Sequence, residues 1–401
     1  MLVSMPPSTS WKSTGSWAST TSIAESEDLS KARILFFVPD GNLATNGVFA
    51  SQVGGLAKYC ESLGAKIMIW DNGMTSRMWF YQLPRHFRRL ARQDDRLMAF
   101  NPTHIYVRTF ASAIAAKELA KKTGAKLVYS MRGADVAEAL LGRDLRAYVI
   151  AAWSWLCVRR AMKFADHVNS VSKTMAEWIW RKFGRKASVL PCCIAQDGLD
   201  SRVGEKSWRN ENEVELGGEE IVGEGAGKTI IYSGGLSAWQ KIDAIIALMK
   251  RISEVDVNIK FRFLTKDVAA LTRLCEKAGL DSSRWSAKSC KQSEVVEELT
   301  KADCGIILRD DTLVNQVASP IKVGEYLAAG LGIIASPFIG DVGKDFADKG
   351  FACMVDENTL VERIVKFVNN MTEDRRAEAR KWAMTHLTYE GNRSAVLEMF
   401  S

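Results

Sequence analysis

Hydrophobic and polar residues follow two alternating patterns along residues 31–200. Short continuous apolar runs, each ended by a polar residue or a proline, are typical of strands buried in a parallel sheet. Between them lie stretches such as 111–124, whose alanines and Leu119 share one helical face. The apolar runs are 33–40 (RILFFVPD), 65–71, 104–108, 126–131, 167–172 and 188–192. Strands that alternate with helices predict a parallel sheet covered on both faces.

The same alternation restarts at residue 229. Residues 201–228 hold seven Glu and six Gly without apolar periodicity, which indicates a linker or an exposed loop. The expected elements beyond it are strands 229–234, 260–265, 304–309 and 332–336 and helices 240–252, 267–279, 293–301 and 322–330. The predicted fold is therefore α/β, with doubly wound domains at 31–200 and 229–385. Two such domains normally bind a ligand between them, at the carboxyl ends of their strands.

The two ends of the chain have different patterns. Residues 1–30 carry 13 Ser or Thr and no apolar stretch longer than three, which predicts a disordered tail rather than a signal peptide. The tail has no arginine, which disfavours a transit peptide. Residues 386–401 are expected to form a helix that packs back on the first domain. The sequence has no run of eighteen apolar residues, so no membrane-spanning helix is predicted.

Composition is that of a soluble globular protein, with 47% hydrophobic and 25% charged residues. The eight cysteines form no Cys-x-x-Cys pair and lie mostly in apolar runs, which predicts buried reduced thiols in a cytosolic protein without structural zinc.

The net charge of +7 is unevenly distributed. Residues 31–200 hold 26 Lys and Arg against 13 Asp and Glu, whereas residues 201–401 are slightly acidic. The first domain is therefore expected to meet an anionic partner. Nucleic acid, membrane phosphate and phosphorylated small molecules are all consistent with that charge.

Two segments concentrate the basic residues of the first domain. Residues 77–97 interleave six arginines with aromatic side chains, and residues 146–163 form an apolar stretch flanked by arginines. Such mixtures suit a membrane interface with anionic lipid. For 77–97 a solvated face is an equal alternative, and for 146–163 a buried helix is the favoured interpretation.

The most specific string is 302–336, which predicts a strand, an irregular loop, a helix and a strand. Ser319 and Pro320 are typical of a capped helix start. Lys322 follows in the first turn, where the helix dipole disfavours a cation, so a phosphate ligand would explain it. Glu325, about one turn on, is placed to accept hydrogen bonds from sugar hydroxyls. An ordinary capped helix with surface charges is the alternative.

This helix start, SPIKVGEYLAAG (319–330), resembles the Ser-Pro-x-Lys-x-x-Glu-Tyr-Leu-Ala-x-Gly segment of retaining glycosyltransferases of family four, in particular polysaccharide and capsule members. The resemblance covers roughly residues 33–400. It implies the GT-B superfold, in which two Rossmann-like domains face each other across a cleft. It also implies that the second domain holds a UDP- or GDP-linked nucleotide sugar, with Glu325 at the ribose.

A second string, YSGGLSAWQKID (232–243), is similar to the strand, glycine loop and lysine of the same family. Lys241 matches the lysine that neutralises the leaving diphosphate. The donor-binding residues implied in the second domain are Gly234, Gly235, Ser319, Pro320, Ile321 and Lys322.

Two positions depart from the family. The first of its two glutamates would fall at position 317, where this chain has Val, and an arginine often found at the position of Gly235 is absent. Arg309, at the carboxyl end of a predicted strand, is a candidate for the missing charge. A salt bridge from Arg309 to Asp310 or Asp311 is the alternative.

The first domain carries two further matches. NGVFASQV (46–53) is similar to the glycine loop of the family, in which Gly47 lets the backbone approach the diphosphate or acceptor. SMRGADVAEAL (130–140) resembles its Arg-Gly segment, which places Arg132, Asp135 and Glu138 on the acceptor side. A structural salt bridge is an equal alternative for Asp135 and Glu138.

No Asp-x-Asp triplet occurs, and the four histidines lack ligand spacing, so neither a metal nor another cofactor is expected. Lys241, Arg309 or Lys322 would then stabilise the departing diphosphate. The predicted function is retaining, metal-independent transfer of a hexose to a glycan or lipid-linked acceptor, in the cytoplasm and at most peripherally on a membrane. An inactive nucleotide-sugar-binding subunit is one alternative. A nucleic-acid-binding protein is a distant one, because no reading module is recognisable.

Overall fold

The computed structural model describes residues 28–39, 50–71, 83–142, 144–194, 227–290 and 294–401. The chain divides into two compact units. Unit 1 comprises residues up to Leu190 together with Arg393–Ser401, and unit 2 comprises Pro191–Asn392. The first unit thus ends before residue 200, and the second extends past residue 385. The predicted linker lies outside the described residues up to position 226.

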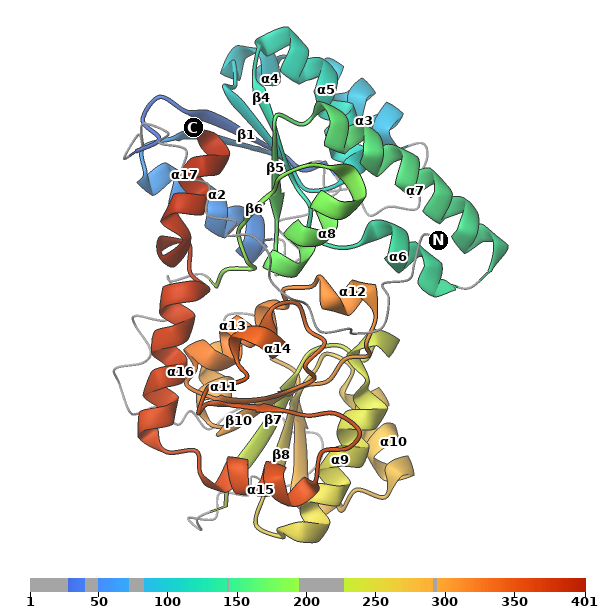
Figure 1. Ribbon diagram of the computed structural model, residues 1–401, viewed down its shortest axis with the longest axis vertical. Coiled ribbons are helices and arrows are strands. Elements are labelled where there is room, and N and C mark those ends of the chain that lie inside the picture. Colours follow the sequence, from blue (N-terminus) through green and yellow to red (C-terminus); the bar gives the residue numbers. More distant parts are fainter. Residues whose placement is uncertain (1–27, 40–49, 72–82, 143, 195–226, 291–293) are drawn as a thin grey trace. The chain divides into compact units, whose positions relative to one another are not determined.

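Unit 1 contains a six-stranded parallel sheet in the order β2-β1-β3-β4-β5-β6 (Figure 1). Its strands are β1 (Arg33–Phe37), β2 (Lys66–Trp70), β3 (His104–Val107), β4 (Lys126–Ser130), β5 (His167–Ser170) and β6 (Ser188–Val189). Each lies within one of the apolar runs. In β1, the four residues from Ile34 to Phe37 are fully buried, because both faces of the sheet are covered.

Helices connect successive strands of unit 1. They are η1 (Ala50–Gly54), α2 (Gly55–Ser62), α3 (Leu83–Arg92), α4 (Asp95–Phe100), α5 (Phe110–Thr123), α6 (Asp135–Ala139), η2 (Leu140–Gly142), α7 (Leu145–Phe164), α8 (Lys173–Phe183) and, at the end of the chain, α17 (Arg393–Phe400). The described part of the predicted tail is packed: Leu29 is buried, and its N–H donates to Leu63 O at 2.8 Å.

Unit 2 repeats the design with a parallel sheet in the order β12-β11-β10-β7-β8-β9 (Figure 1). Its strands are β7 (Thr229–Ser233), β8 (Lys260–Leu264), β9 (Trp285–Lys288), β10 (Cys304–Ile307), β11 (Gly332–Ala335) and β12 (Ala352–Met354). The sequence pattern does not predict β9 and β12. Both are edge strands, and β9 has only half-buried residues, so neither forms a long apolar run.

The helical elements of unit 2 are η4 (Ala238–Gln240), α9 (Ile242–Val255), α10 (Val268–Ala278), η5 (Ser282–Arg284), α11 (Val295–Thr300), α12 (Leu313–Gln316), α13 (Ile321–Ala328), α14 (Val342–Asp345), α15 (Val361–Asn369), α16 (Glu373–His386) and η6 (Glu390–Asn392). Strands β7 and β10 are neighbours at the centre of this sheet. Loops that leave their carboxyl ends therefore lie side by side.

The last helix of the chain packs on the sheet of unit 1. Phe400 in α17 contacts Phe36, His104 and Tyr106, with ring centroids 6.0–6.4 Å away. Lys126 Nζ donates to Ser401 O at 2.6 Å. The segment that returns to the first domain is thus α17 alone, whereas α16 stays with unit 2.

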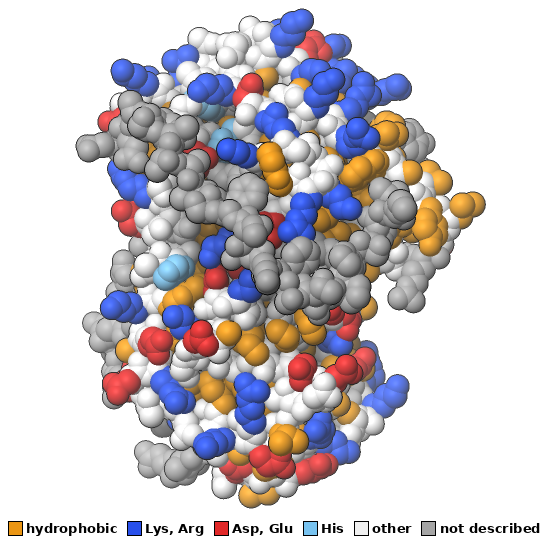
Figure 2. Space-filling view, in the orientation of Figure 1, with side chains coloured by type: hydrophobic (Ala, Val, Ile, Leu, Met, Phe, Trp, Pro, Cys, Tyr) orange, Lys and Arg blue, Asp and Glu red, His pale blue; other side chains and the backbone are white. Residues whose placement is uncertain are grey.

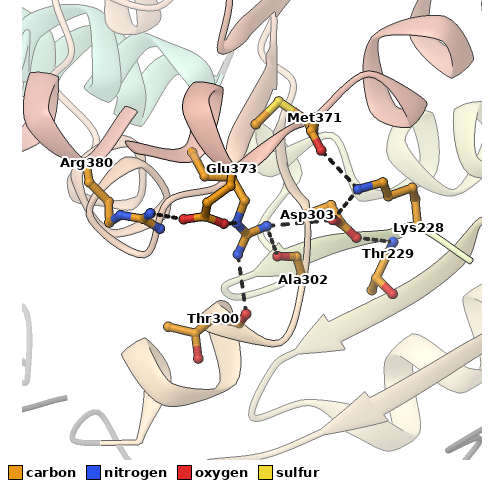
Figure 3. Close-up of polar contacts among 9 residues, drawn as sticks. Lys228, Thr229, Thr300, Ala302, Asp303, Met371, Glu373 and Arg380 are labelled. Atoms are coloured by element: carbon orange, nitrogen blue, oxygen red, sulfur yellow. Dashed lines mark hydrogen bonds and ion pairs between the residues drawn. The ribbon is translucent and has the colours of Figure 1, made fainter. Parts of the chain in front are cut away.

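An ionic network at the amino ends of β7 and β10 fastens α16 to the sheet of unit 2 (Figure 3). Asp303 accepts from Lys228 Nζ at 3.0 Å and from Thr229 N at 2.9 Å. Arg376 of α16 lies 3.6 Å from the same carboxylate and donates to Ala302 O at 2.9 Å. These groups satisfy one another at the end of the sheet opposite the carboxyl ends, so the network has a structural role.

Helix α7 is buried on one side only. Its inner side chains include Ala147, Ala151, Cys157 and Val158, which pack in the core of unit 1. Leu145 and Val149, on the other side, are 82% and 63% exposed. The favoured interpretation of 146–163 as a buried helix therefore holds for one side of α7 only, because apolar residues cover more of the helix than the core of unit 1 can contact.

All eight cysteines are free, and six of them are buried, in line with the expected reduced thiols. No helix in the described ranges has the length and apolar character needed to cross a membrane.

Candidate functional site

The predicted donor residues lie at the carboxyl ends of the central strands of unit 2. Gly234 and Gly235 follow β7 directly, and Arg309 lies two residues after β10. Lys322 is in the first turn of α13, which follows the β10 loop. Hydrogen bonds bring the side chains of Arg309 and Lys322 together.

Two cations share one acceptor at this site. Arg309 Nη2 donates to Gln240 Oε1 at 2.7 Å, and Lys322 Nζ donates to the same oxygen at 2.9 Å. Gln240 is the last residue of η4, in the loop that connects β7 to α9. The two positive charges converge, and the group that holds them is a neutral amide.

The site is partly shielded from water, and this weakens the basicity of both cations. Burial, followed by the charge of Arg309, lowers the pKa of Lys322 to about 7, although Glu325 acts in the opposite direction. Burial also lowers the pKa of Arg309, whose exposed fraction is 7%. An anion placed between them would relieve this repulsion.

The salt bridge considered for Arg309 does not form. Its guanidinium donates to Leu308 O at 2.8 Å and to Gln240, and its N–H is held by Ser336 Oγ at 2.9 Å. Asp310 pairs with Lys241 instead, and Asp311 accepts from Gln316. Arg309 is thus held by neutral groups and keeps its charge for another partner.

A glycine makes room for Lys322. Gly234 has φ +148°, and a Cβ there would overlap the ammonium group of Lys322. Tyr232, the last but one residue of β7, also packs against Lys322. The Lys322 Nζ lies 4.7 Å from the centre of the Tyr232 ring. The Tyr232 hydroxyl donates to Gly235 O at 2.6 Å, which fixes the glycine loop.

Lys241 lies in the same loop but points to a carboxylate. It adopts a left-handed conformation, with φ 52° and ψ 41°, immediately before α9. Its Nζ forms an ion pair with Asp310 Oδ1, and both side chains are partly exposed. The structure therefore places Lys241 against the loop that follows β10, at the residue after Arg309.

The start of α13 differs from the expected cap. Pro320 is itself the N-cap residue, with φ −69° and ψ 127°, and Ile321 is the first helical residue. The Ser319 hydroxyl accepts from Cys192 N at 3.1 Å rather than from the helix. The predictions of a Ser cap and a first-turn proline are wrong. The backbone of Pro320 is extended, so the helix begins one residue later than expected, at Ile321.

Glu325 and Tyr326 lie one turn further along α13. Glu325 is half-buried and close enough to Lys322 to raise its pKa. Tyr326 is fully buried, and its hydroxyl oxygen accepts from Ser233 N at 2.9 Å, which ties α13 to β7. Val317, in the place of the first family glutamate, is fully buried and belongs to the core.

Unit 1 places the predicted acceptor residues after β4. Arg132 Nη2 lies 3.4 Å from the Tyr106 hydroxyl, and Asp135 begins α6. Burial raises the pKa of Glu138. In the described part of the chain Glu138 forms no ion pair, so the salt bridge considered for it is absent. Gly47 lies outside the described residues.

The sequence did not identify Gln240 and Tyr232 as site residues. Both occur in the string YSGGLSAWQKID, next to the glycines and lysine that were identified. The hydrogen bonds of Gln240 join residues 69 and 82 positions apart, which no local pattern reveals. Within the described ranges, no group of three or more His, Cys, Asp or Glu could hold a metal ion.

Gly234→Ala is expected to destabilise unit 2 by about 1–3 kcal/mol, because alanine is strained at this φ and its Cβ displaces Lys322. Urea unfolding followed by tryptophan fluorescence measures the change. Gly235→Ala is the matched control: a Cβ there has no neighbour within 4 Å, so its cost should stay below about 0.5 kcal/mol. Equal losses for the two variants would contradict the proposed packing of Lys322 against Gly234.

Comparisons with known proteins concern the family and the fold of the chain. Residues 48–197 match the model of the family described as Glycosyltransferase Family 4. No curated protein sequence matches the chain.

Several solved structures share the fold. Sucrose-phosphate synthase from Thermosynechococcus elongatus is similar with a TM-score of 0.68 at 12% identity, over 92% of this chain and 97% of that one. The catalytic domain of starch synthase IV from Arabidopsis thaliana, bound to ADP and acarbose, has a TM-score of 0.66 at 13% identity, over 92% and 98%. Anabaena HepE in complex with UDP and glucose has a TM-score of 0.58 at 12% identity, over 91% and 98%.

These likenesses extend over both units. The predicted α/β fold with two doubly wound domains of the GT-B type is thereby confirmed. The resemblance to family-four glycosyltransferases is also confirmed for the matched residues.

Proposed function

We propose that this chain, whose fold is that of GT-B glycosyltransferases and whose residues 48–197 match family four, transfers a hexose from a nucleotide diphosphate sugar to a hydroxyl acceptor. The observation that carries the proposal is the pair of cations, Arg309 and Lys322, on the single amide oxygen of Gln240. Such a pair, in which Arg309 is buried, Lys322 is half-buried and neutral groups hold both, suits a diphosphate.

The chemical contribution of the pair is charge stabilisation. When the bond between sugar and diphosphate breaks, negative charge accumulates on the leaving phosphate oxygens. Cations already fixed in a water-poor site stabilise this charge without reorganisation. Arg309 and Lys322 supply that charge, and we infer that the reaction needs no metal ion. Lys241 would exchange its Asp310 partner for a phosphate oxygen when the donor binds.

The residue that contacts the nucleoside part of the donor is assigned from its position in α13. Glu325, one turn after Lys322, is proposed to accept hydrogen bonds from the ribose. A uridine or guanosine nucleotide is the expected donor. The HepE structure contains UDP and glucose, which supports a uridine nucleotide for this chain as well.

The acceptor is proposed to be a glycan or a lipid-linked glycan in a polysaccharide pathway, with the anomeric configuration retained. Arg132, Asp135 and Glu138, at the carboxyl end of β4, are the residues assigned to it. The protein would act in the cytoplasm and bind a membrane peripherally. No nucleic-acid partner is included in the proposal.

The experiment starts with the donor. UDP-, GDP- and CMP-sugars are screened by thermal shift, and the sugar that raises the melting temperature is incubated with and without acceptor glycans while nucleotide diphosphate release is measured. Release is expected in the wild type and should fall at least tenfold in Lys241→Ala and Glu325→Ala. Lys277→Ala, an exposed lysine of α10, is the matched control and should be unaffected.

An inactive nucleotide-sugar-binding subunit is the second candidate. Buried Val317 favours it, because no glutamate side chain is available there for the donor sugar. Stabilisation by a nucleotide sugar without release under any acceptor would support this candidate. Failure of every sugar to raise the melting temperature would overturn both.

A further inference from the structure

A basic groove lies on unit 1 among helices α3, α5, α7 and α8. It has a volume of about 1050 Å³, and eight of its sixteen lining residues are Lys or Arg, with no carboxylate among them. Arg85 and Arg88 come from α3, and Arg159 and Arg160 come from α7. Part of the excess positive charge of the first domain is therefore gathered in this groove.

The outer side of α7 next to this groove is apolar. Leu145, Val149, Trp153 and Leu156 are spaced three or four residues apart, Tyr148 is next to Val149, and all five are between 37% and 82% exposed. Residues at this spacing lie along one side of a helix. Figure 2 shows hydrophobic side chains gathered over α7, at the right-hand edge of the view. Trp153 and Leu156 also line the groove, so the apolar stripe and the basic groove form one continuous surface.

Cations continue the stripe over the last turns of α7. Arg159, Arg160 and Lys163 are exposed, and α7 contains no Asp or Glu. Among the residues that the structure describes, none of these three forms an ion pair. Lys117 of α5 lies beside them, with its Nζ 4.6 Å from the centre of the Phe164 ring. The surface thus combines unpaired positive charge with exposed aliphatic and aromatic side chains.

We propose that this surface docks on an anionic lipid bilayer. The apolar side chains of α7 would enter the boundary between head groups and acyl chains, while Arg159, Arg160 and the other groove cations would contact lipid phosphates. Two features of the surface favour a bilayer as its partner: the charge complementarity with lipid phosphates and the exposed aliphatic side chains. A polyanion such as nucleic acid would satisfy the arginines but would leave Leu145, Val149 and Leu156 in water.

The inference deepens the membrane-associated part of the function proposed above, and it rests on that part. It adds the docking surface and the chemistry of the lipid. Docking involves only residues of unit 1 that lie outside the candidate donor site. Failure of vesicle binding would therefore leave donor binding and nucleotide release intact, so the two proposals can fail separately.

The test is co-sedimentation of the full chain with vesicles of phosphatidylcholine alone or mixed with phosphatidylglycerol. Binding is expected only with the anionic lipid, and it should weaken as salt rises because the charges are screened. Arg159→Glu with Arg160→Glu should reduce binding at least tenfold, since each basic residue contributes roughly fivefold, the equivalent of about 1 kcal/mol. Val149→Gln with Leu156→Gln should reduce it as well, without any change of charge.

Two control variants match these changes. Arg273→Glu with Lys277→Glu, on exposed positions of α10, alters the net charge equally. Val257→Gln with Leu360→Gln replaces exposed apolar residues of unit 2. Both should bind vesicles like the wild type. The proposal is overturned if the wild type ignores anionic vesicles, if the α10 variant loses as much binding as the α7 variant, or if only RNA and not vesicles distinguishes the charge variants.

Discussion

Lys322→Gln is expected to lower the turnover of the nucleotide sugar by two to three orders of magnitude. Lys322 is one of two cations that share the oxygen of Gln240, and glutamine keeps a hydrogen-bond donor while removing the charge. Loss of one fixed donor to developing negative charge typically costs a factor of this size. Nucleotide release under saturating donor measures it, with Lys277→Gln of α10 as the control.

The same residue should also set the pH dependence. The pKa of Lys322 is lowered to about 7 in the free protein, mainly by burial and then by the charge of Arg309. Below about pH 7 the Lys322 ammonium of the free protein is charged and can bind an anion. Above about pH 7 it loses its proton and with it the positive charge. The kcat/KM ratio, which reports the free enzyme, should therefore fall with rising pH above about 7, by up to tenfold per pH unit. A bound diphosphate stabilises the ammonium, so kcat should fall only at higher pH.

Lys322→Gln should abolish this falling limb. A wild-type kcat/KM that stays flat from pH 6.5 to 8.5, or a variant that keeps both its turnover and the limb, would exclude the assigned role. Lys322→Arg separates charge from basicity: it remains charged over this range and should give a flat profile with part of the activity.

Gly305→Ala should destabilise unit 2 by about 3 kcal/mol. Gly305 lies in β10, and a Cβ there would overlap the ring of Tyr326. The ring cannot move aside easily, because it is fully buried and its hydroxyl is bound to Ser233 N. Overpacking of this kind costs about 1–3 kcal/mol, and we expect a value at the upper end because the Tyr326 ring is held in place. Urea unfolding gives the free energy.

A double-mutant cycle tests the cause of that loss. In a Tyr326→Leu background the ring is absent, so Gly305→Ala should cost much less than in the wild type. If the cost is the same in both backgrounds, the contact with Tyr326 does not explain it. The single variant should also weaken donor binding, since Tyr326 links α13, which carries Lys322, to the end of β7.

The sequence predicts the framework well and the site only in part. Ten of the twelve strands coincide with apolar runs, and eight of these ten lie inside a sheet, where a covered parallel strand must be apolar on both faces. The edge strands β9 and β12 lack a long apolar run and were missed, whereas the edge strands β2 and β6 have one and were predicted. At the site, the helix-start pattern identifies Lys322 and the family resemblance identifies Lys241, but neither reveals that Lys322 is bound to Gln240 and Lys241 to Asp310.

Two features of the site depend on contacts between residues that lie far apart in the sequence. The Ser319 hydroxyl binds Cys192 N, 127 positions away, rather than the helix start. Arg309 could equally have paired with the acids that follow it, and only the packed structure places Gln240 within reach. A hydrogen bond between distant residues depends on the path of the whole backbone and on competition among partners, so spacing alone cannot choose between them.

By itself, the sequence determined that this protein has two doubly wound α/β domains, that one of them is basic, and that its helix start at 319–330 resembles that of family-four glycosyltransferases. Only the tertiary structure decided that Arg309 and Lys322 converge on a neutral acceptor and that α7 exposes the apolar side next to its arginines. The physical reason is the same in both cases. Periodicity fixes which residues share a face, whereas burial and electrostatic environment depend on what the rest of the chain brings against that face.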